Sequence, residues 1–197
     1  MRGKFIVFEG LDGAGSSTQA NLLADYLRLS GKKAIVTKEP TNNIIGGLIR
    51  GQLSSDWKTS QECLQLLFTA DRAHHLEKEI LPSLEQGITV ICDRYILSTL
   101  AFGGLDCDMS WLKKLNEKFP TPDITVVLDV SSATCIKRIK SARFGMELFE
   151  KEEKLSKVWQ NYEQLKTYHP NTHIVDGEKD EKDVLKSVIS LINSHSA

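Results

Sequence analysis

Residues 5–17 read FIVFEGLDGAGSS and carry the clearest structural signal in the chain. The run Phe5–Phe8 is apolar and typical of a buried strand, and a helical pattern extends from about Ser17 to Ser30. Between them, Gly10–Ser17 nearly fits the phosphate-loop pattern G-x-x-x-x-G-K-[ST]. Small residues let backbone N–H groups turn inward around a polyphosphate, and the helix N-terminus adds partial positive charge. The stretch predicts a nucleotide-phosphate site; a plain glycine turn between strand and helix is the alternative.

The loop departs from its pattern at one position, where Ser16 replaces the lysine. Ser17 keeps the hydroxyl that binds Mg²⁺ in such loops. A charge-assisted hydrogen bond is worth about 1.5–3 kcal/mol, whereas an arginine that stabilises the transition state of phosphoryl transfer is worth about 10³–10⁵-fold in rate. An arginine from elsewhere in the chain can cover the loss. The alternative is a protein that binds nucleotide but catalyses poorly.

Short apolar runs alternate with helical patterns along the rest of the chain. This alternation predicts an α/β fold of three layers, with a five-stranded parallel sheet between helices, in a single domain over residues 1–197. Ser131 or Ser132 is expected to cap the helix after the fourth strand. The later strands are predicted at Ala34–Thr37, Ile88–Cys92, Ile124–Val130 and His173–Val175, and the later helices at about 59–85, 110–119, 150–168 and 184–192.

Polar residues follow the predicted strands at corresponding places. Glu39 follows the second strand, Asp93-Arg94 follow the third, Asp129 ends the fourth and Asp176-Gly177 follow the fifth. Ligands of open parallel sheets bind outside the carboxyl ends of the strands. The pattern favours one site at that edge, although strand ends are often polar simply because they meet water.

Composition restricts the partners. Of 197 residues, 25 are basic and 26 acidic, for a net charge of −1, so we expect no nucleic-acid or membrane surface. The four cysteines lack metal-type spacing and favour a reducing compartment. The run Phe5–Phe8 is too short for a signal-peptide core or a membrane span, so the expected location is cytoplasmic.

Four further motifs follow the loop in a characteristic order. They are KEPT at 38–41 with GLIR at 47–50, FTADR at 68–72, DRY at 93–95 with ST at 98–99 and AF at 101–102, and a lid pattern around 143–150. Together with FEGLDGAG and STQ in the loop, they resemble the thymidylate kinases of the nucleoside monophosphate kinase group, with serine in place of the loop lysine. The resemblance spans nearly the whole chain.

The resemblance implies a P-loop kinase fold with a lid at about residues 138–150. The implied reaction transfers a phosphoryl group from ATP, with Mg²⁺, to thymidine monophosphate, giving ADP and thymidine diphosphate. The implied partners are these small nucleotides and a second copy of the chain in a homodimer.

The resemblance also assigns the donor side of the site. Mg²⁺ is expected at Ser17, Asp93 and Glu39, and Asp12 is expected to bond the 3′-hydroxyl of the acceptor sugar. The loop residues expected to hold ATP are Gly10, Leu11, Asp12, Gly13, Ala14, Gly15, Ser16, Ser17 and Thr18.

For the acceptor, the family implies that Phe68 stacks on thymine and Arg72 bonds a base carbonyl. Their spacing of four places both on one helical face, where a core phenylalanine and a surface ion-pair arginine are the alternatives. The other expected acceptor contacts are Glu39, Arg50, Arg94, Thr99 and Phe102, of which Arg50 is otherwise a solvated helix residue. Bacterial members often have Tyr-Gln where Phe102-Gly103 stand here.

The lid completes the expected machinery. Family members with a small residue at the position of Ala14 carry an extra arginine in the lid. Arg143 matches that arginine, whereas Leu148 replaces a second lid arginine. Arg138, one helical turn before Arg143, is expected to stack on adenine; a basic helix face is the alternative for both arginines. The residues expected to act in catalysis are Asp12, Asp93, Arg94 and Arg143.

Two other functions compete with this one. The first is a P-loop kinase for a different monophosphate or for a deoxynucleoside. The second is a nucleotide-binding protein that has lost catalysis, for which Ser16 is the whole argument. His74 and His75 are expected to be surface or core residues of a helix, without a metal role.

Overall fold

The computed structural model describes residues 2–142 and 149–195, and its centre is a five-stranded parallel sheet in the order β2-β3-β1-β4-β5. The phosphate-loop strand β1 therefore lies in the middle of the sheet. The strands are β1 (Phe5–Gly10), β2 (Ala34–Lys38), β3 (Thr89–Asp93), β4 (Ile124–Asp129) and β5 (Thr172–Asp176). The predicted parallel sheet and its three-layer arrangement are confirmed.

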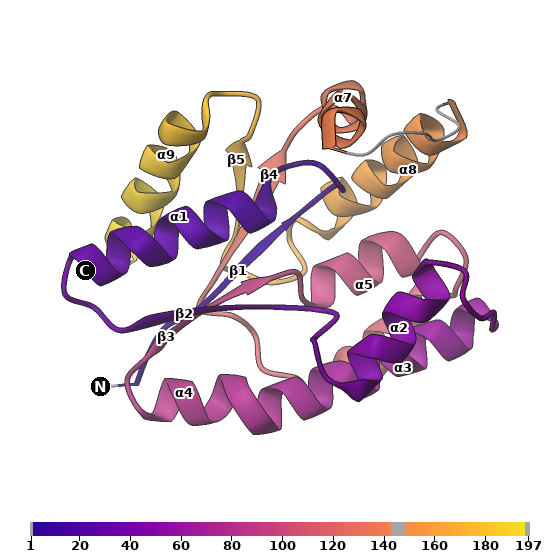
Figure 1. The fold of residues 1–197 in the computed structure, drawn as a ribbon, viewed down its shortest axis with the longest axis horizontal. Helices are drawn as coiled ribbons and strands as arrows, with labels where there is room; N and C mark the ends of the chain where they lie inside the picture. Colours follow the sequence, from indigo (N-terminus) through magenta and orange to yellow (C-terminus); the bar gives the residue numbers. More distant parts are fainter. Residues whose placement is uncertain (1, 143–148, 196–197) are drawn as a thin grey trace.

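Helices cover both faces of this sheet (Figure 1). Helices α1 and α9 pack together on one side, and α4 lies on the other (Figure 1). Helix α5 packs on α8 and on α6. The helices are α1 (Ser16–Leu29), α2 (Ile44–Leu53), α3 (Gln61–His75), the π-helical turn η1 (Leu76–Ile80), α4 (Leu81–Glu85), α5 (Ile96–Gly103), α6 (Met109–Asn116), α7 (Ser132–Ala142), α8 (Phe149–Leu165) and α9 (Glu181–Ser194).

The core explains the apolar run at the start of the chain. All six residues of β1 are buried, because the strand has neighbours on both edges and helices on both faces. Strands of this kind lack the apolar–polar alternation of half-exposed strands. In register, Phe8 pairs with Asp93 and Gly10 with Leu128, so the phosphate loop leaves the sheet beside the ends of β3 and β4.

The sequence missed two helices, each for a local reason. Helix α5 is buried over most of its surface, so it lacks the polar face that gives a helical period. Helix α2 contains three glycines, and Asn43 caps it by accepting a hydrogen bond from the Gly46 N–H at 3.0 Å. Ser131 caps α7 by accepting from the Thr134 N–H at 3.2 Å, as one of the two predicted serines. None of the helices in the described ranges is both long and apolar enough to cross a membrane.

Candidate active site

The phosphate loop joins β1 to α1 through glycines that the backbone requires. Gly13 and Gly15 have φ values of 86° and 98°, a region that favours glycine. A Cβ atom at Gly13 would lie 2.6 Å from the Cys135 carbonyl oxygen, so the loop also passes closely under α7. No side chain caps the start of α1, and its first turn carries no acidic residue. The first N–H groups of α1 are thus left for an anion.

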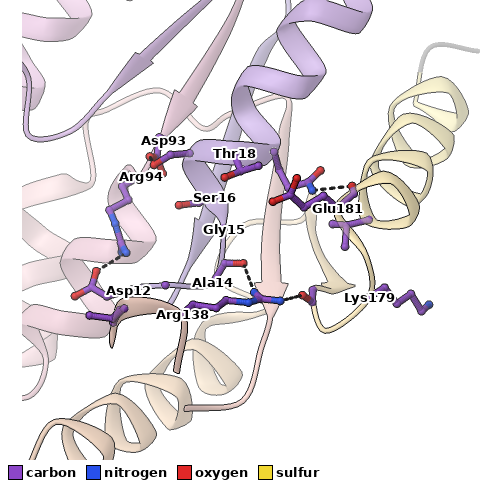
Figure 2. A pocket seen from close by; sticks show the side chains of 16 residues that line it. Asp12, Ala14, Gly15, Ser16, Thr18, Asp93, Arg94, Arg138, Lys179 and Glu181 are labelled. Atoms are coloured by element: carbon purple, nitrogen blue, oxygen red, sulfur yellow. Dashed lines mark hydrogen bonds and ion pairs between the residues drawn. The ribbon is translucent and has the colours of Figure 1, made fainter. Parts of the chain in front are cut away.

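A cavity of about 830 Å³ opens in front of this loop. Its walls come from the loop, the end of β3, α7 and the segment between β5 and α9. Three cationic side chains line the described part of it: Arg94, Arg138 and Lys179 (Figure 2). Ser16 also lines it and is largely buried. Asp129 and Asp176 end the paired strands β4 and β5 at this edge of the sheet, but neither lines the cavity. Gly177, the residue after Asp176, does line it.

Arg138 lies alongside the loop (Figure 2). Its guanidinium donates to the Ala14 carbonyl oxygen at 3.2 Å and to the Gly177 carbonyl oxygen at 3.1 Å. The residue expected to stack on adenine thereby connects the phosphate loop to the segment before α9. The other lid residues of the prediction, Arg143 and Leu148, lie outside the described residues.

Two oxygens at the end of β3 have the chemistry of a magnesium site. The Ser17 hydroxyl donates to Asp93 Oδ2. The second oxygen, Oδ1, is buried and has no hydrogen-bond partner among the described residues. Carboxylate and hydroxyl oxygens are hard ligands of the kind Mg²⁺ takes, and an unpartnered buried carboxylate oxygen is what a missing cation would leave. Both residues fit the metal.

Glu39, the third expected metal ligand, is bonded elsewhere. Its Oε2 accepts from Arg72 Nε at 2.9 Å, and its Oε1 lies 3.2 Å from His75 Nδ1. The side chains of Glu39 and Arg72 are 3% and 1% exposed, so their ion pair is nearly free of water. With both oxygens taken by protein groups, Glu39 positions Arg72 in this structure.

Arg94 connects the loop to the third strand. Its backbone has φ = 73°, which non-glycine residues rarely adopt. Its guanidinium bonds Asp12 at 2.7 Å, the Gly10 carbonyl at 3.1 Å and the Ser98 hydroxyl at 3.0 Å. Burial opposes the charge of Arg94, but nearby acids, Asp12 first, outweigh it and raise the pKa. The guanidinium is fixed and charged between two strands.

A buried carboxylate behind Arg94 escaped the sequence analysis. Glu9 accepts from the Tyr95 N–H at 2.9 Å, from the Tyr162 hydroxyl at 3.0 Å and from the Ser98 hydroxyl. Burial raises the pKa of Glu9, and the hydrogen bond from Ser98 and the charge of Arg94 oppose that rise. A charged residue inside an apolar strand was the available signal for this group.

A second cavity, of about 510 Å³, collects the residues expected to bind the acceptor. Phe68 and Arg72 from α3 and Thr99 and Phe102 from α5 all line it. The ring of Phe102 lies under the Arg94 guanidinium, 5.0 Å from centroid to Cζ. Asp12, Asp93 and Arg94 line both cavities, so the two meet at these three residues.

Arg72 is held by a network that the sequence did not indicate. Besides Glu39, its guanidinium donates to Thr99 Oγ1 at 3.0 Å and to Asn116 Oδ1. His75, on the far side of Glu39, bonds the Thr37 hydroxyl at 2.7 Å. His75 is a buried residue of α3, which is one of the two placements expected for it. Asn116 gave no signal, because its partner is distant in sequence.

Arg50 is turned toward the protein. Its guanidinium donates to the Thr41 carbonyl oxygen, and it is not among the residues that line the second cavity. Asp71 holds Thr41 in place, accepting from its N–H at 2.7 Å and its hydroxyl at 2.6 Å. The expected contact between Arg50 and an acceptor phosphate stays a prediction.

Comparison with known proteins agrees with this arrangement. The thymidylate kinase family model matches residues 8–188. The chain is 40% identical to a probable thymidylate kinase of Pyrococcus horikoshii, over 98% of this chain and 97% of that protein. It is 46% identical to a thymidylate kinase of Desulfotalea psychrophila, over 79% and 78% of the two chains. A solved thymidylate kinase structure from Candida albicans superposes with a TM-score of 0.82 at 28% identity, covering 99% of this chain and 93% of the other. This chain belongs to the thymidylate kinase family.

Proposed function

We propose that this protein transfers the γ-phosphoryl group of ATP to thymidine monophosphate. The observation that carries the proposal is the junction of two cavities at Asp12, Asp93 and Arg94. One cavity has a phosphate loop, and the other has three aromatic rings, Phe68 and Phe102 among them, and the buried guanidinium of Arg72. A donor and an acceptor bound in them would meet phosphate to phosphate.

The donor binds with its phosphates on the loop N–H groups at the start of α1. Arg138 and Lys179 line the same cavity, and we assign the nucleoside of ATP to their side of it. Ser17 and Asp93 would hold Mg²⁺, which neutralises phosphate charge when bound. Arg94 contributes a fixed positive charge at the junction, and this charge partly compensates for the lysine that Ser16 replaces in the loop.

The acceptor binds with its base between α3 and α5. Phe68 and Phe102 offer apolar rings, and Arg72 offers guanidinium N–H groups to a base carbonyl. Asp12, which lines both cavities, is placed to accept from a sugar hydroxyl. We assign the acceptor phosphate to Arg94, and to Arg50 once it leaves the Thr41 carbonyl.

In the reaction, an oxygen of the acceptor phosphate attacks the γ-phosphorus of ATP in line. A new P–O bond forms as the bond between the γ-phosphorus and the bridging β-oxygen breaks, and that electron pair leaves with ADP. The protein positions both nucleotides and stabilises the negative charge, without a covalent intermediate. We also propose that Arg143 closes over the transferred group from the lid.

The test is coupled ADP release with ATP, Mg²⁺ and a panel of acceptors. The panel contains thymidine, uridine, cytidine and adenosine monophosphates and free thymidine. Turnover that prefers thymidine monophosphate supports the proposal. Preference for another monophosphate or for free thymidine would assign a different kinase, and ATP binding without turnover would indicate a nucleotide-binding protein. The homodimer implied by the family stays a prediction, which sedimentation velocity checks.

A further inference from the structure

The carboxamide oxygen of Gln65 is buried without a hydrogen-bond partner among the described residues. Gln65 lies on α3, is 5% exposed, and its Oε1 accepts no hydrogen bond from the described residues. A buried amide oxygen without a donor is unfavourable, since it has lost water and gained nothing. Of the described side chains that line the second cavity, Gln65 and Asp93 have such an oxygen, and Asp93 is assigned to the metal.

The position of Gln65 on the helix relates it to the acceptor. Gln65, Phe68 and Arg72 stand at i, i+3 and i+7, so α3 presents an amide, a ring and a guanidinium on one face. All three line the second cavity. The amide therefore occupies the same wall as the two groups expected to contact the base.

A glycine on the opposite helix leaves room for this amide. A Cβ atom at Gly103 would lie 2.9 Å from Gln65 Cδ and Oε1 and 3.2 Å from Nε2. Gly103 ends α5 in helical conformation, so its backbone does not require glycine. It stands one turn after Thr99, on the same face of α5. The missing side chain at 103 makes space for the Gln65 carboxamide.

We propose that Gln65 reads the base edge of the acceptor nucleotide, an inference that rests on the proposed function. Thymine presents an acceptor, a donor and an acceptor along its O4–N3–O2 edge. Arg72 can only donate, and the Thr99 hydroxyl oxygen already accepts one hydrogen bond from Arg72, whereas both lone pairs of Gln65 Oε1 are free to accept the ring N3–H. The soft last torsion of glutamine lets the amide turn toward the ligand. Its N–H₂ group can donate to a neighbouring carbonyl.

The direct test is calorimetric titration of the whole protein with thymidine monophosphate, which needs no turnover. We expect Gln65→Leu to weaken binding about 10-fold, the loss of one or two hydrogen bonds at a buried site. The dissociation constant for ATP should stay the same. The melting temperature should stay the same or rise, because leucine removes the unpartnered amide. Gln164→Leu, on an exposed part of α8, is the matched control and should change none of these values.

Two variants at Gly103 separate recognition from packing. Gly103→Ala favours the helix but displaces the Gln65 amide, so thymidine monophosphate binding should weaken without loss of melting temperature. Gln65→Ala combined with Gly103→Gln moves the amide to the opposite helix and should recover part of the lost affinity. N3-methylthymidine monophosphate should bind wild type and Gln65→Leu with similar affinities, because it has no N3–H to offer.

The outcomes distinguish the two levels of the argument. Unchanged affinity for thymidine monophosphate in Gln65→Leu, with tight binding by the wild type, overturns the role of Gln65 and leaves the proposed function standing. Failure of the wild type to bind thymidine monophosphate overturns both. A fall in melting temperature with unchanged affinity would assign Gln65 to packing alone.

Discussion

The Arg94 guanidinium lies 2.7 Å from Asp12 Oδ1, and this ion pair joins the third strand to the phosphate loop at the place where two cavities meet. The same guanidinium bonds the Gly10 carbonyl and the Ser98 hydroxyl. A planar fork with several N–H groups can satisfy these partners at once, which a lysine ammonium cannot do with the same geometry.

Replacement of Arg94 by lysine should therefore reduce turnover strongly. We expect kcat to fall about 100-fold or more in Arg94→Lys, since the charge remains but its fixed position is lost. The measurement is steady-state coupled ADP release at saturating nucleotides. Arg28→Lys, an exposed change on α1, serves as control. A kcat within twofold of wild type would remove Arg94 from the reaction.

The carboxylate of Asp93 should set the magnesium requirement. Asparagine at this position keeps the shape of the side chain but removes the charge that would balance the cation. We therefore expect Asp93→Asn to need at least about 10-fold more Mg²⁺ for half-maximal rate, a loss of metal affinity typical of changes to the groups around a metal. Ser17→Ala should shift the same titration in the same direction. Magnesium curves that superpose on the wild-type curve would place the metal elsewhere.

The buried ion pair between Glu39 and Arg72 should dominate the stability of the acceptor side. Arg72→Met leaves Glu39 as an uncompensated buried charge, which we expect to cost about 3–5 kcal/mol in the free energy of unfolding. Adding Glu39→Gln should restore part of that loss, because the stranded charge is then gone. Chemical denaturation of both variants gives the comparison. A double variant as unstable as the sum of its single changes would show that the pair is not coupled.

The pH dependence of stability should carry the signature of Glu9. Burial raises the pKa of Glu9 in the folded state, so folding favours the protonated form. The contribution of Glu9 to stability is then fully present below the pKa of the unfolded chain, near 4.5, and declines as pH rises through the raised folded pKa. In Glu9→Gln this decline should disappear, and the free energy of unfolding relative to wild type should increase with pH between pH 4 and 8. Parallel curves for the two proteins would contradict the assignment.

The sequence predicted the parallel sheet correctly, because the sheet follows from local patterns. A buried central strand, a glycine loop and a helix start are all contained in residues 5–17. Phe68, Arg72, Thr99 and Phe102 meet around one cavity as the family resemblance implied. The sequence could not predict contacts between distant segments, such as those of Arg72 with Asn116 and of Glu9 with Tyr162.

The expected contact between Glu39 and the metal stays a prediction, and the structure adds protein partners that the sequence did not indicate. The Glu39 carboxylate bonds Arg72 through one oxygen and His75 through the other. The helix pattern did not reveal α5, since burial on nearly all sides leaves no polar stripe. The free space over Gly103 likewise depends on how α3 and α5 cross, which sequence spacing does not encode.

The most direct measurement follows the fate of the γ-phosphate of ATP. The unaltered protein, with Ser16 in its loop, is incubated with γ-labelled ATP, Mg²⁺ and thymidine monophosphate, and the products are separated. We expect label in thymidine diphosphate, with a rate that Ser16→Lys changes by less than about 10-fold because arginines already supply the charge. Labelled inorganic phosphate alone, or transfer that appears only in Ser16→Lys, would contradict this expectation.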